Sequence, residues 1–157
     1  RLGALGEGTF AVVLLLRDEE TSTHYALKAI SKDQLRREGQ ETMVNNERQL
    51  MNLFDNDFIV RMHHTYEDAK YVYLLLEPVL GGELFDVYTE HSLWGNVDFA
   101  RFYCACVALG IAHMHLKRVV WRDLKLENCL LDERGYLKLT DLGIAKLVLG
   151  KTYTVCG

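Results

Sequence analysis

Three polar residues in the last third of the chain have a spacing that strongly limits what the chain can fold into. Asp123 and Asn128 lie five residues apart in the segment W-R-D-L-K-L-E-N, and Asp141 follows thirteen residues later, after a short apolar strand at 136–139. This spacing predicts a base and two oxygen ligands on consecutive short loops. Asp123 is suited to accept a hydroxyl proton, and Asn128 and Asp141 carry the hard oxygen atoms that Mg²⁺ prefers. With Lys125 to offset charge, the set indicates phosphoryl transfer.

Two charged residues nearer the start of the chain interrupt apolar patterns. Lys28 stands inside an otherwise apolar strand predicted at 25–30. Glu47 is the charge in a helical stripe of apolar residues, namely Met43, Val44, Leu50 and Met51. A buried unpaired charge is very costly, so we expect the two residues to pair with each other. The pair leaves the Lys28 ammonium group able to reach phosphate oxygens; an ion pair with a purely architectural role is the alternative.

The chain opens with a glycine-rich loop. The segment G-E-G-T-F-A-V-V at 6–13 fits the pattern G-x-G-x-x-G-x-V, with Ala11 in the third glycine position. Glycines let backbone N–H groups approach phosphate oxygens closely. A dinucleotide-binding loop requires a helix to follow, whereas here an aliphatic strand follows, and the G-K-[ST] of a P-loop is missing. Taken alone, the segment is also compatible with an ordinary hairpin turn.

The pattern of the whole chain predicts an α+β fold with two units. The first unit is expected to hold strand–turn–strand at 5–16, a strand at 25–30, a helix at 33–54, and strands at 59–67 and 71–77. A connector with Pro78 and two glycines spans 78–82. Asn96 is a good N-cap for a helix that runs to about residue 115. Its apolar stripe consists of Phe99, Phe102, Tyr103 and Cys106, and short strands and loops follow at 119–140. The two units join near residues 77–82, and ligand pockets form at junctions of this kind.

Composition excludes several classes of function. The net charge of -4 over 157 residues gives no basic surface for nucleic acid. The uninterrupted apolar runs are too short to cross a bilayer, so no membrane span is expected. The four cysteines include no C-x-x-C pair, which argues against a zinc or thioredoxin-type site and favours reduced thiols in the cytoplasm.

Together these segments resemble a eukaryotic-type protein kinase of the AGC serine/threonine group, most closely its cyclic-nucleotide-dependent branch. The resemblance covers essentially the whole chain and rests on Y-A-L-K at 25–28, N-E at 46–47, L-G-G-E-L-F at 80–85, R-D-L-K at 122–125, D-L-G-I-A-K at 141–146 and K-T-Y-T-V-C-G at 151–157. It implies a bilobal fold, with an ATP-binding lobe at 1–79 and a partial helical lobe at 80–157 that ends in the activation loop. ATP and Mg²⁺ are the implied cofactors.

The resemblance also assigns the site residues. ATP would contact Leu5, Gly6, Glu7, Gly8, Thr9, Phe10, Val13, Ala26, Lys28, Leu76, Glu77, Val79, Glu83, Leu130 and Thr140. The metal ligands would be Asn128 and Asp141, and the catalytic residues Asp123, Lys125, Lys28 and Glu47.

Substrate and regulation follow from the same resemblance. Glu83 and Glu127 would favour basic residues before the phosphoacceptor of a protein substrate. Thr154 would be the activating phosphosite, with Arg122 and Lys146 as its cationic partners. A cyclic-nucleotide-binding regulatory domain or subunit is an implied partner.

Several positions depart from the family pattern. Trp121 replaces a histidine or tyrosine, Leu142 a phenylalanine and Leu126 a proline, while Ala11 replaces a glycine. None of them removes a reacting group. A silent pseudokinase or a truncated nucleotide-binding scaffold is the alternative function. The A-P-E element and the helices expected after it are absent from the sequence, so we expect this chain alone to be inactive and marginally stable.

Overall fold

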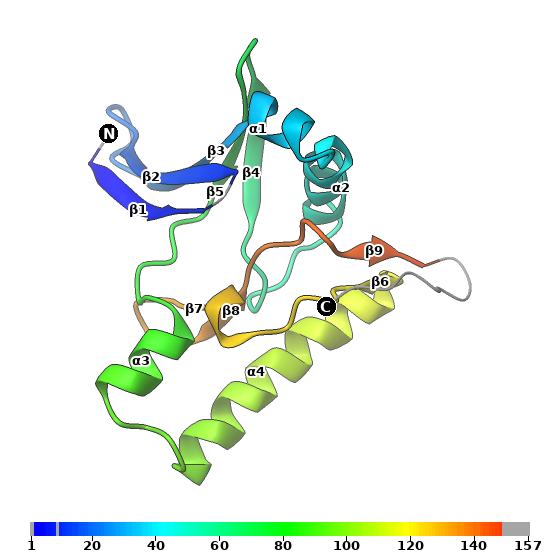
Figure 1. Ribbon diagram of the computed structural model, residues 1–157. Helices are drawn as coiled ribbons and strands as arrows, with labels where there is room; N and C mark the ends of the chain where they lie inside the picture. The colour runs from blue at the N-terminus through cyan, green and yellow to red at the C-terminus, as the bar shows by residue number, and fades with distance from the viewer. Residues whose placement is uncertain (1, 9, 149–157) are drawn as a thin grey trace.

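A five-stranded antiparallel sheet forms the first part of the fold. The computed structural model describes residues 2–8 and 10–148, and the sheet has the strand order β1-β2-β3-β5-β4 (Figure 1). Its strands are β1 (Gly3–Glu7), β2 (Ala11–Arg17), β3 (His24–Ser31), β4 (Met62–Glu67) and β5 (Tyr71–Leu76). In the middle of the sheet, Lys28 of β3 is opposite Val13 of β2 and Leu74 of β5. The β-rich lobe and the α+β class are confirmed.

The single helix expected at 33–54 is wrong: the structure has two helices there. α1 (Lys32–Arg37) ends at Glu38, and α2 (Glu41–Met51) begins three residues later. Gly39 between them has a φ of 63°, in the left-handed region that ends helices. The break lets α2 lie against the sheet on its own axis, which places Val44, Leu50 and Met51 in the core.

The expected strand at 59–67 begins only at Met62, since Ile59 instead forms a parallel bridge to Leu139.

The connector between the two parts runs close to a later strand. Gly81 N donates to the Leu131 carbonyl at 2.7 Å, and a Cβ added at Gly81 would lie 2.6 Å from that oxygen. Glycine is therefore required for this close approach.

In residues 80–148, the second part consists of two α-helices, a 3-10 helix and two short sheets (Figure 1). The helices are α3 (Leu84–Glu90) and α4 (Val97–Leu116), and the 3-10 helix η1 covers Leu126–Asn128. The sheets pair β6 (Val119–Val120) with β9 (Lys146–Leu147), and β7 (Cys129–Leu131) with β8 (Leu137–Leu139). This arrangement agrees with a truncated bilobal fold; the boundary at 79/80 stays a prediction.

Helix α4 is capped as expected, and its buried stripe contains two of the four expected residues, Tyr103 and Cys106, but not Phe99 or Phe102. The Asn96 side chain accepts hydrogen bonds from the backbone N–H groups of residues 98 and 99. The buried positions are Tyr103, Cys106, Gly110 and Met114, whereas Phe99 and Phe102 are each 41% exposed. A Cβ added at Gly110 would lie 2.7 Å from the Leu139 side chain, so α4 rests directly on β8.

In the described part of the chain, α4 alone is long and apolar enough to cross a membrane by length and composition. Asp98 and Arg101 interrupt its first turns, so the uninterrupted apolar part of the sequence is too short to predict a span. One such helix is weak evidence for a membrane span, and α4 packs on β6 and β8 through its buried positions.

Candidate active site

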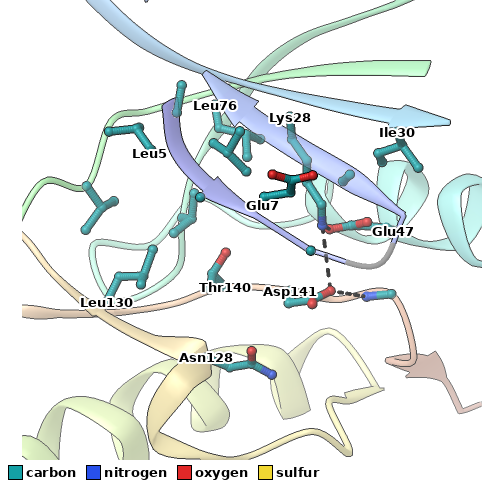
Figure 2. A pocket seen from close by; sticks show the side chains of 18 of the residues that line it. Leu5, Glu7, Lys28, Ile30, Glu47, Leu76, Asn128, Leu130, Thr140 and Asp141 are labelled. Carbon is teal, nitrogen blue, oxygen red and sulfur yellow. Dashed lines mark hydrogen bonds and ion pairs between the residues drawn. The ribbon is translucent and has the colours of Figure 1, made fainter. Parts of the chain in front are cut away.

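A cavity of about 610 Å³ lies between the sheet and the loops of the second part. This volume suits a small-molecule ligand. Figure 2 shows Lys28 and Glu47 on one side and Asn128, Thr140 and Asp141 on the other. The structure brings to this cavity the expected nucleotide contacts Leu5, Gly6, Glu7, Gly8, Phe10, Val13, Ala26, Lys28, Leu76, Glu77, Val79, Glu83, Leu130 and Thr140. Thr9 lies outside the described residues.

Lys28 bridges two carboxylates inside the cavity. Its Nζ lies 2.8 Å from Glu47 Oε1 and 3.7 Å from Asp141 Oδ1. Burial alone would lower the pKa of Lys28, but the charges and hydrogen bonds of Glu47 and Asp141 outweigh it and the pKa is raised. Glu47 is 5% exposed, so without Lys28 it would be a buried unpaired charge. The predicted pairing of Lys28 with Glu47 is thus present in the structure.

The backbone of Asp141 is held in an unusual conformation. Its φ is 59°, which non-glycine residues seldom adopt and which tertiary contacts must hold. The Trp121 indole Nε1 donates a 2.9 Å hydrogen bond to the Asp141 carbonyl, and Gly143 N donates a 3.4 Å hydrogen bond to Asp141 Oδ1. Trp121 is 3% exposed. The tryptophan that departs from the family pattern therefore fixes the residue expected to bind metal.

Asp123 and Asn128 are joined by two hydrogen bonds beneath the cavity. Asn128 Nδ2 donates to the Asp123 carbonyl at 3.1 Å and to Asp123 Oδ2 at 2.7 Å. Lys125 Nζ lies 3.4 Å from the same Oδ2. The short helix η1 places Asn128 on the turn that brings it back to Asp123. Asp123 and Lys125 do not line the cavity, whereas Asn128 does.

The donor set facing the cavity fits a hard divalent cation. Because the Asn128 amide nitrogen donates to Asp123, its amide oxygen is the atom that remains as a ligand. Asp141 offers a carboxylate whose side chain is 49% exposed, and both residues line the same cavity. Oxygen ligands of this kind, two from protein with phosphate oxygens and water completing the shell, are what Mg²⁺ takes. Asn128 and Asp141 are the residues that would hold it.

Residues 1–157 match the protein kinase domain family. The chain belongs to the protein kinase family. It is 41% identical over 153 residues to a cGMP-dependent protein kinase of Plasmodium berghei (strain Anka), covering 98% of this chain and 18% of that protein. It is 42% identical over 153 residues to cAMP-dependent protein kinase catalytic subunit 2 of Drosophila melanogaster, covering 98% of this chain and 43% of that protein. For cAMP-dependent protein kinase type 3 of Saccharomyces cerevisiae (strain ATCC 204508 / S288c), the identity is 38% over 156 residues, with 99% and 39% covered. The chain spans less than half the length of each relative.

Glu77, the residue before the connector at 78–82, forms an ion pair that the sequence did not predict. Glu77 Oε1 accepts hydrogen bonds from Lys138 Nζ at 3.0 Å and from the backbone N–H of Arg61 at 2.7 Å. The Lys138 side chain is 11% exposed and that of Glu77 is 23% exposed. The pair ties the end of the kinase sheet to β8 of the other part, directly beside the cavity.

An acidic group lies at the mouth of the kinase cavity. Glu83 and Glu127 both line it. Burial raises the pKa of Glu83, and the nearby charges of Asp86 and Glu127 raise it further, with Lys125 acting in the opposite direction. The two expected substrate-contacting glutamates are therefore close enough to repel each other. A bound cation would relieve this repulsion.

Arg122, an expected partner of the phosphosite, is engaged within the kinase fold. Its Nε donates to the Ile144 carbonyl at 2.8 Å, and its Nη2 donates to the same oxygen. Its Nη1 is buried and has no hydrogen-bond partner among residues 2–8 and 10–148. Thr154 lies outside the described residues, so its pairing with Arg122 and Lys146 stays a prediction.

Proposed function

We propose that the protein that contains this chain is an ATP- and Mg²⁺-dependent serine/threonine protein kinase. The single observation that carries the proposal is the arrangement around Lys28, whose ammonium group joins Glu47 of α2 to Asp141 across the cavity. Membership of the protein kinase family supports it. A structural ion pair alone would not explain why Asn128, which lines the same cavity, is hydrogen-bonded to the expected base Asp123.

Each residue then has a chemical task. Bound ATP and Mg²⁺ supply the transferable phosphoryl group and the charge that offsets its oxygens. Lys28, oriented by Glu47, binds phosphate oxygens, and Asn128 with Asp141 holds the metal. Asp123 accepts the proton of the attacking hydroxyl; because Asn128 donates to Oδ2, we assign Oδ1 as the acceptor atom. Lys125, 3.4 Å from Oδ2, offsets negative charge at this place.

The acceptor is a serine or threonine of a protein with basic residues before it. Lys125 belongs to the serine/threonine form of the R-D-L-K segment. Glu83 and Glu127 supply negative charge at the mouth of the cavity, where an arginine side chain would pair with both. The printed names of the relatives describe them as cGMP- or cAMP-dependent. By analogy we propose a cyclic-nucleotide-binding regulatory domain or subunit as partner, and the cytoplasm as location.

Regulation by phosphorylation is proposed at Thr154. A phosphate on this residue would carry close to two negative charges and would pair with Arg122 and Lys146. Because Arg122 already holds the Ile144 carbonyl, a phosphate that pairs with it would stabilise the segment after Asp141.

The test uses the full-length protein with a basic serine peptide and MgATP. Asp123→Asn should lower kcat by at least about a hundredfold, as loss of a general base does, while nucleotide affinity is unchanged. The matched control is Asp57→Asn, an exposed aspartate outside the cavity, which should keep full activity. Nucleotide binding without measurable transfer in the unaltered protein would instead support the pseudokinase alternative.

A further inference from the structure

The segment that follows Asp141 is held mainly by side chains from elsewhere in the chain. The Asp141 carbonyl accepts from Trp121, and the Ile144 carbonyl accepts from Arg122. The carbonyls of Gly143 and Ala145 both accept from one group, Asn46 Nδ2, at 3.4 Å and 2.5 Å. Trp121 and Arg122 come from the loop that carries Asp123, whereas Asn46 comes from α2. Asn46 therefore links the helix that carries Glu47 to the segment that carries Asp141.

Packing at the same place leaves little room for α2 to shift. A Cβ added at Gly143 would lie 3.1 Å from the terminal methyl of Met43, so the helix rests directly on this glycine. Gly143 and Ala145 are buried. Their carbonyl oxygens have been removed from water, and a donor is needed to offset that cost. Asn46 is partly buried and supplies one.

These contacts close a ring. Glu47, the neighbour of Asn46 on α2, binds Lys28; Lys28 binds Asp141; and the segment after Asp141 returns to α2 through Asn46. Asn46 and the packing of Met43 on Gly143 together fix α2 relative to the segment that follows Asp141. If Asn46 no longer donates, packing alone holds α2 against this segment, and Glu47 and Asp141 are held less firmly at the separation at which both contact Lys28.

We propose that Asn46 is a positioning residue, which keeps α2 and the Asp141 segment at the separation at which Lys28 is held between Glu47 and Asp141. The inference rests on the proposed function, because it assigns Lys28 to phosphate binding. Asn46 acts through the ion pair and touches neither nucleotide nor acceptor. Its loss should therefore weaken binding of ligands that carry phosphates and leave binding of adenosine, which carries none, unchanged.

Neighbouring asparagines provide a matched pair of variants in the full-length protein. Asn46→Asp replaces the donor by an oxygen that faces two carbonyl oxygens, whereas Asn45→Asp makes the same chemical change at an exposed position. We expect Asn46→Asp to weaken MgATP binding about tenfold, the effect of one lost buried hydrogen bond, and to leave the adenosine Kd within about twofold. Asn45→Asp should leave both Kd values within about twofold. Because aspartate also adds a charge, Asn46→Ala and Asn45→Ala repeat the comparison without one, and they decide the matter if Asn46→Asp does not fold.

A double-mutant cycle tests whether Asn46 acts through Glu47. Glu47→Gln alone should weaken MgATP binding, and adding Asn46→Ala to it should cause little further loss, because the pair that Asn46 positions is already broken. Independent, multiplicative losses would overturn the inference. So would an Asn46→Ala protein with the same MgATP and adenosine Kd values as Asn45→Ala, or one that loses both ligands equally. If the unaltered full-length protein does not bind MgATP at all, the proposed function is overturned together with the inference. If it does bind MgATP, the results for the Asn46 variants decide the inference alone and leave the proposed function unchanged.

Discussion

The indole Nε1 of Trp121 donates a 2.9 Å hydrogen bond to the carbonyl of Asp141, twenty residues away, whose φ is 59°. One buried side chain thus fixes the backbone of the residue that we assign to metal binding. Family members usually have histidine or tyrosine at this position, so the tryptophan keeps the bulk of an aromatic ring and supplies its own N–H donor.

Replacing that tryptophan by phenylalanine should remove the donor and keep most of the bulk. In the full-length protein we expect Trp121→Phe to lower the free energy of unfolding by about 1–3 kcal/mol, because the Asp141 carbonyl is left without this donor. It should also raise the Mg²⁺ concentration needed for half-maximal nucleotide binding. Trp94→Phe is the control, since Trp94 is 55% exposed. Identical denaturation midpoints and Mg²⁺ requirements for the two variants would contradict the role of the indole.

The ion pairs of Lys28 and Lys32 should contribute very differently to the free energy of unfolding. Lys28→Met leaves Glu47 buried and unpaired, which costs about 3–5 kcal/mol where a buried pair is broken. Lys32 makes a 3.0 Å pair with Glu67, whose side chain is 61% exposed, so Lys32→Met should cost about 0–1 kcal/mol. Urea denaturation of the full-length variants measures both. Equal losses would mean that Glu47 finds another partner when Lys28 is absent.

The Lys28 pair should also make stability depend on alkaline pH. The pKa of Lys28 in the folded protein is raised above its ordinary value of 10.5. The ion pair therefore contributes fully below pH 10.5, and this contribution is lost as the pH rises through the folded-state pKa. As the pH rises above 10.5, the unfolding free energy should decline more steeply in the unaltered protein than in Lys28→Met. If the unfolding free energies of the two proteins change in parallel with pH, the protonation of Lys28 is not coupled to folding.

Binding of a basic peptide should weaken in mild acid through Glu83. Burial and the charges of Asp86 and Glu127 raise the pKa of Glu83 from 4.5, so part of its negative charge is lost at a pH where a free glutamate keeps it. The KM for an arginine-containing peptide should rise as the pH falls and Glu83 becomes protonated. The Glu83→Gln variant should have a higher KM that changes less with pH. The exposed Glu133→Gln variant should follow the unaltered protein. A Glu83→Gln profile parallel to that of the unaltered protein would remove Glu83 from peptide recognition.

The ion pair between Glu77 and Lys138 should influence nucleotide binding, although neither residue is one of the expected catalytic residues. Lys138→Met removes the partner of Glu77 and the link between the connector and β8. We expect a weaker adenosine affinity, by about threefold to tenfold, because Glu77, which lines the cavity beside the connector, loses its ion-pair partner. Lys70→Met, at an exposed turn, is the control. Isothermal titration with adenosine measures the effect, and equal affinities would assign Lys138 to stability alone.

Much of the site could be predicted because its charged residues interrupt patterns of apolar residues. Lys28 and Glu47 are charges in apolar patterns, so their burial and pairing follow from the cost of an unpaired buried charge. Lys138 gave no such signal: it alternates with Leu137 and Leu139 as a solvent-facing strand residue would, and its partner Glu77 lies sixty-one residues earlier. A contact between distant segments leaves no trace in local periodicity.

The same limit explains the helix that was predicted too long. Gly39 lies within an otherwise continuous helical pattern, and a single glycine there does not by itself end a helix. The left-handed φ of 63° that Gly39 adopts between α1 and α2 has no signal in the pattern of apolar residues. For α4, periodicity identified an apolar helix, but it could not show which side of that helix β8 would cover.

The most direct test of the central claim is phosphate transfer itself. The full-length protein is incubated with γ-labelled ATP, Mg²⁺ and two peptides that share arginines before the acceptor and differ only in having serine or tyrosine there. The account predicts label on the serine peptide alone, with none when the enzyme carries Asp123→Asn. Label on the tyrosine peptide, or equal labelling by the Asp123→Asn protein, would contradict it.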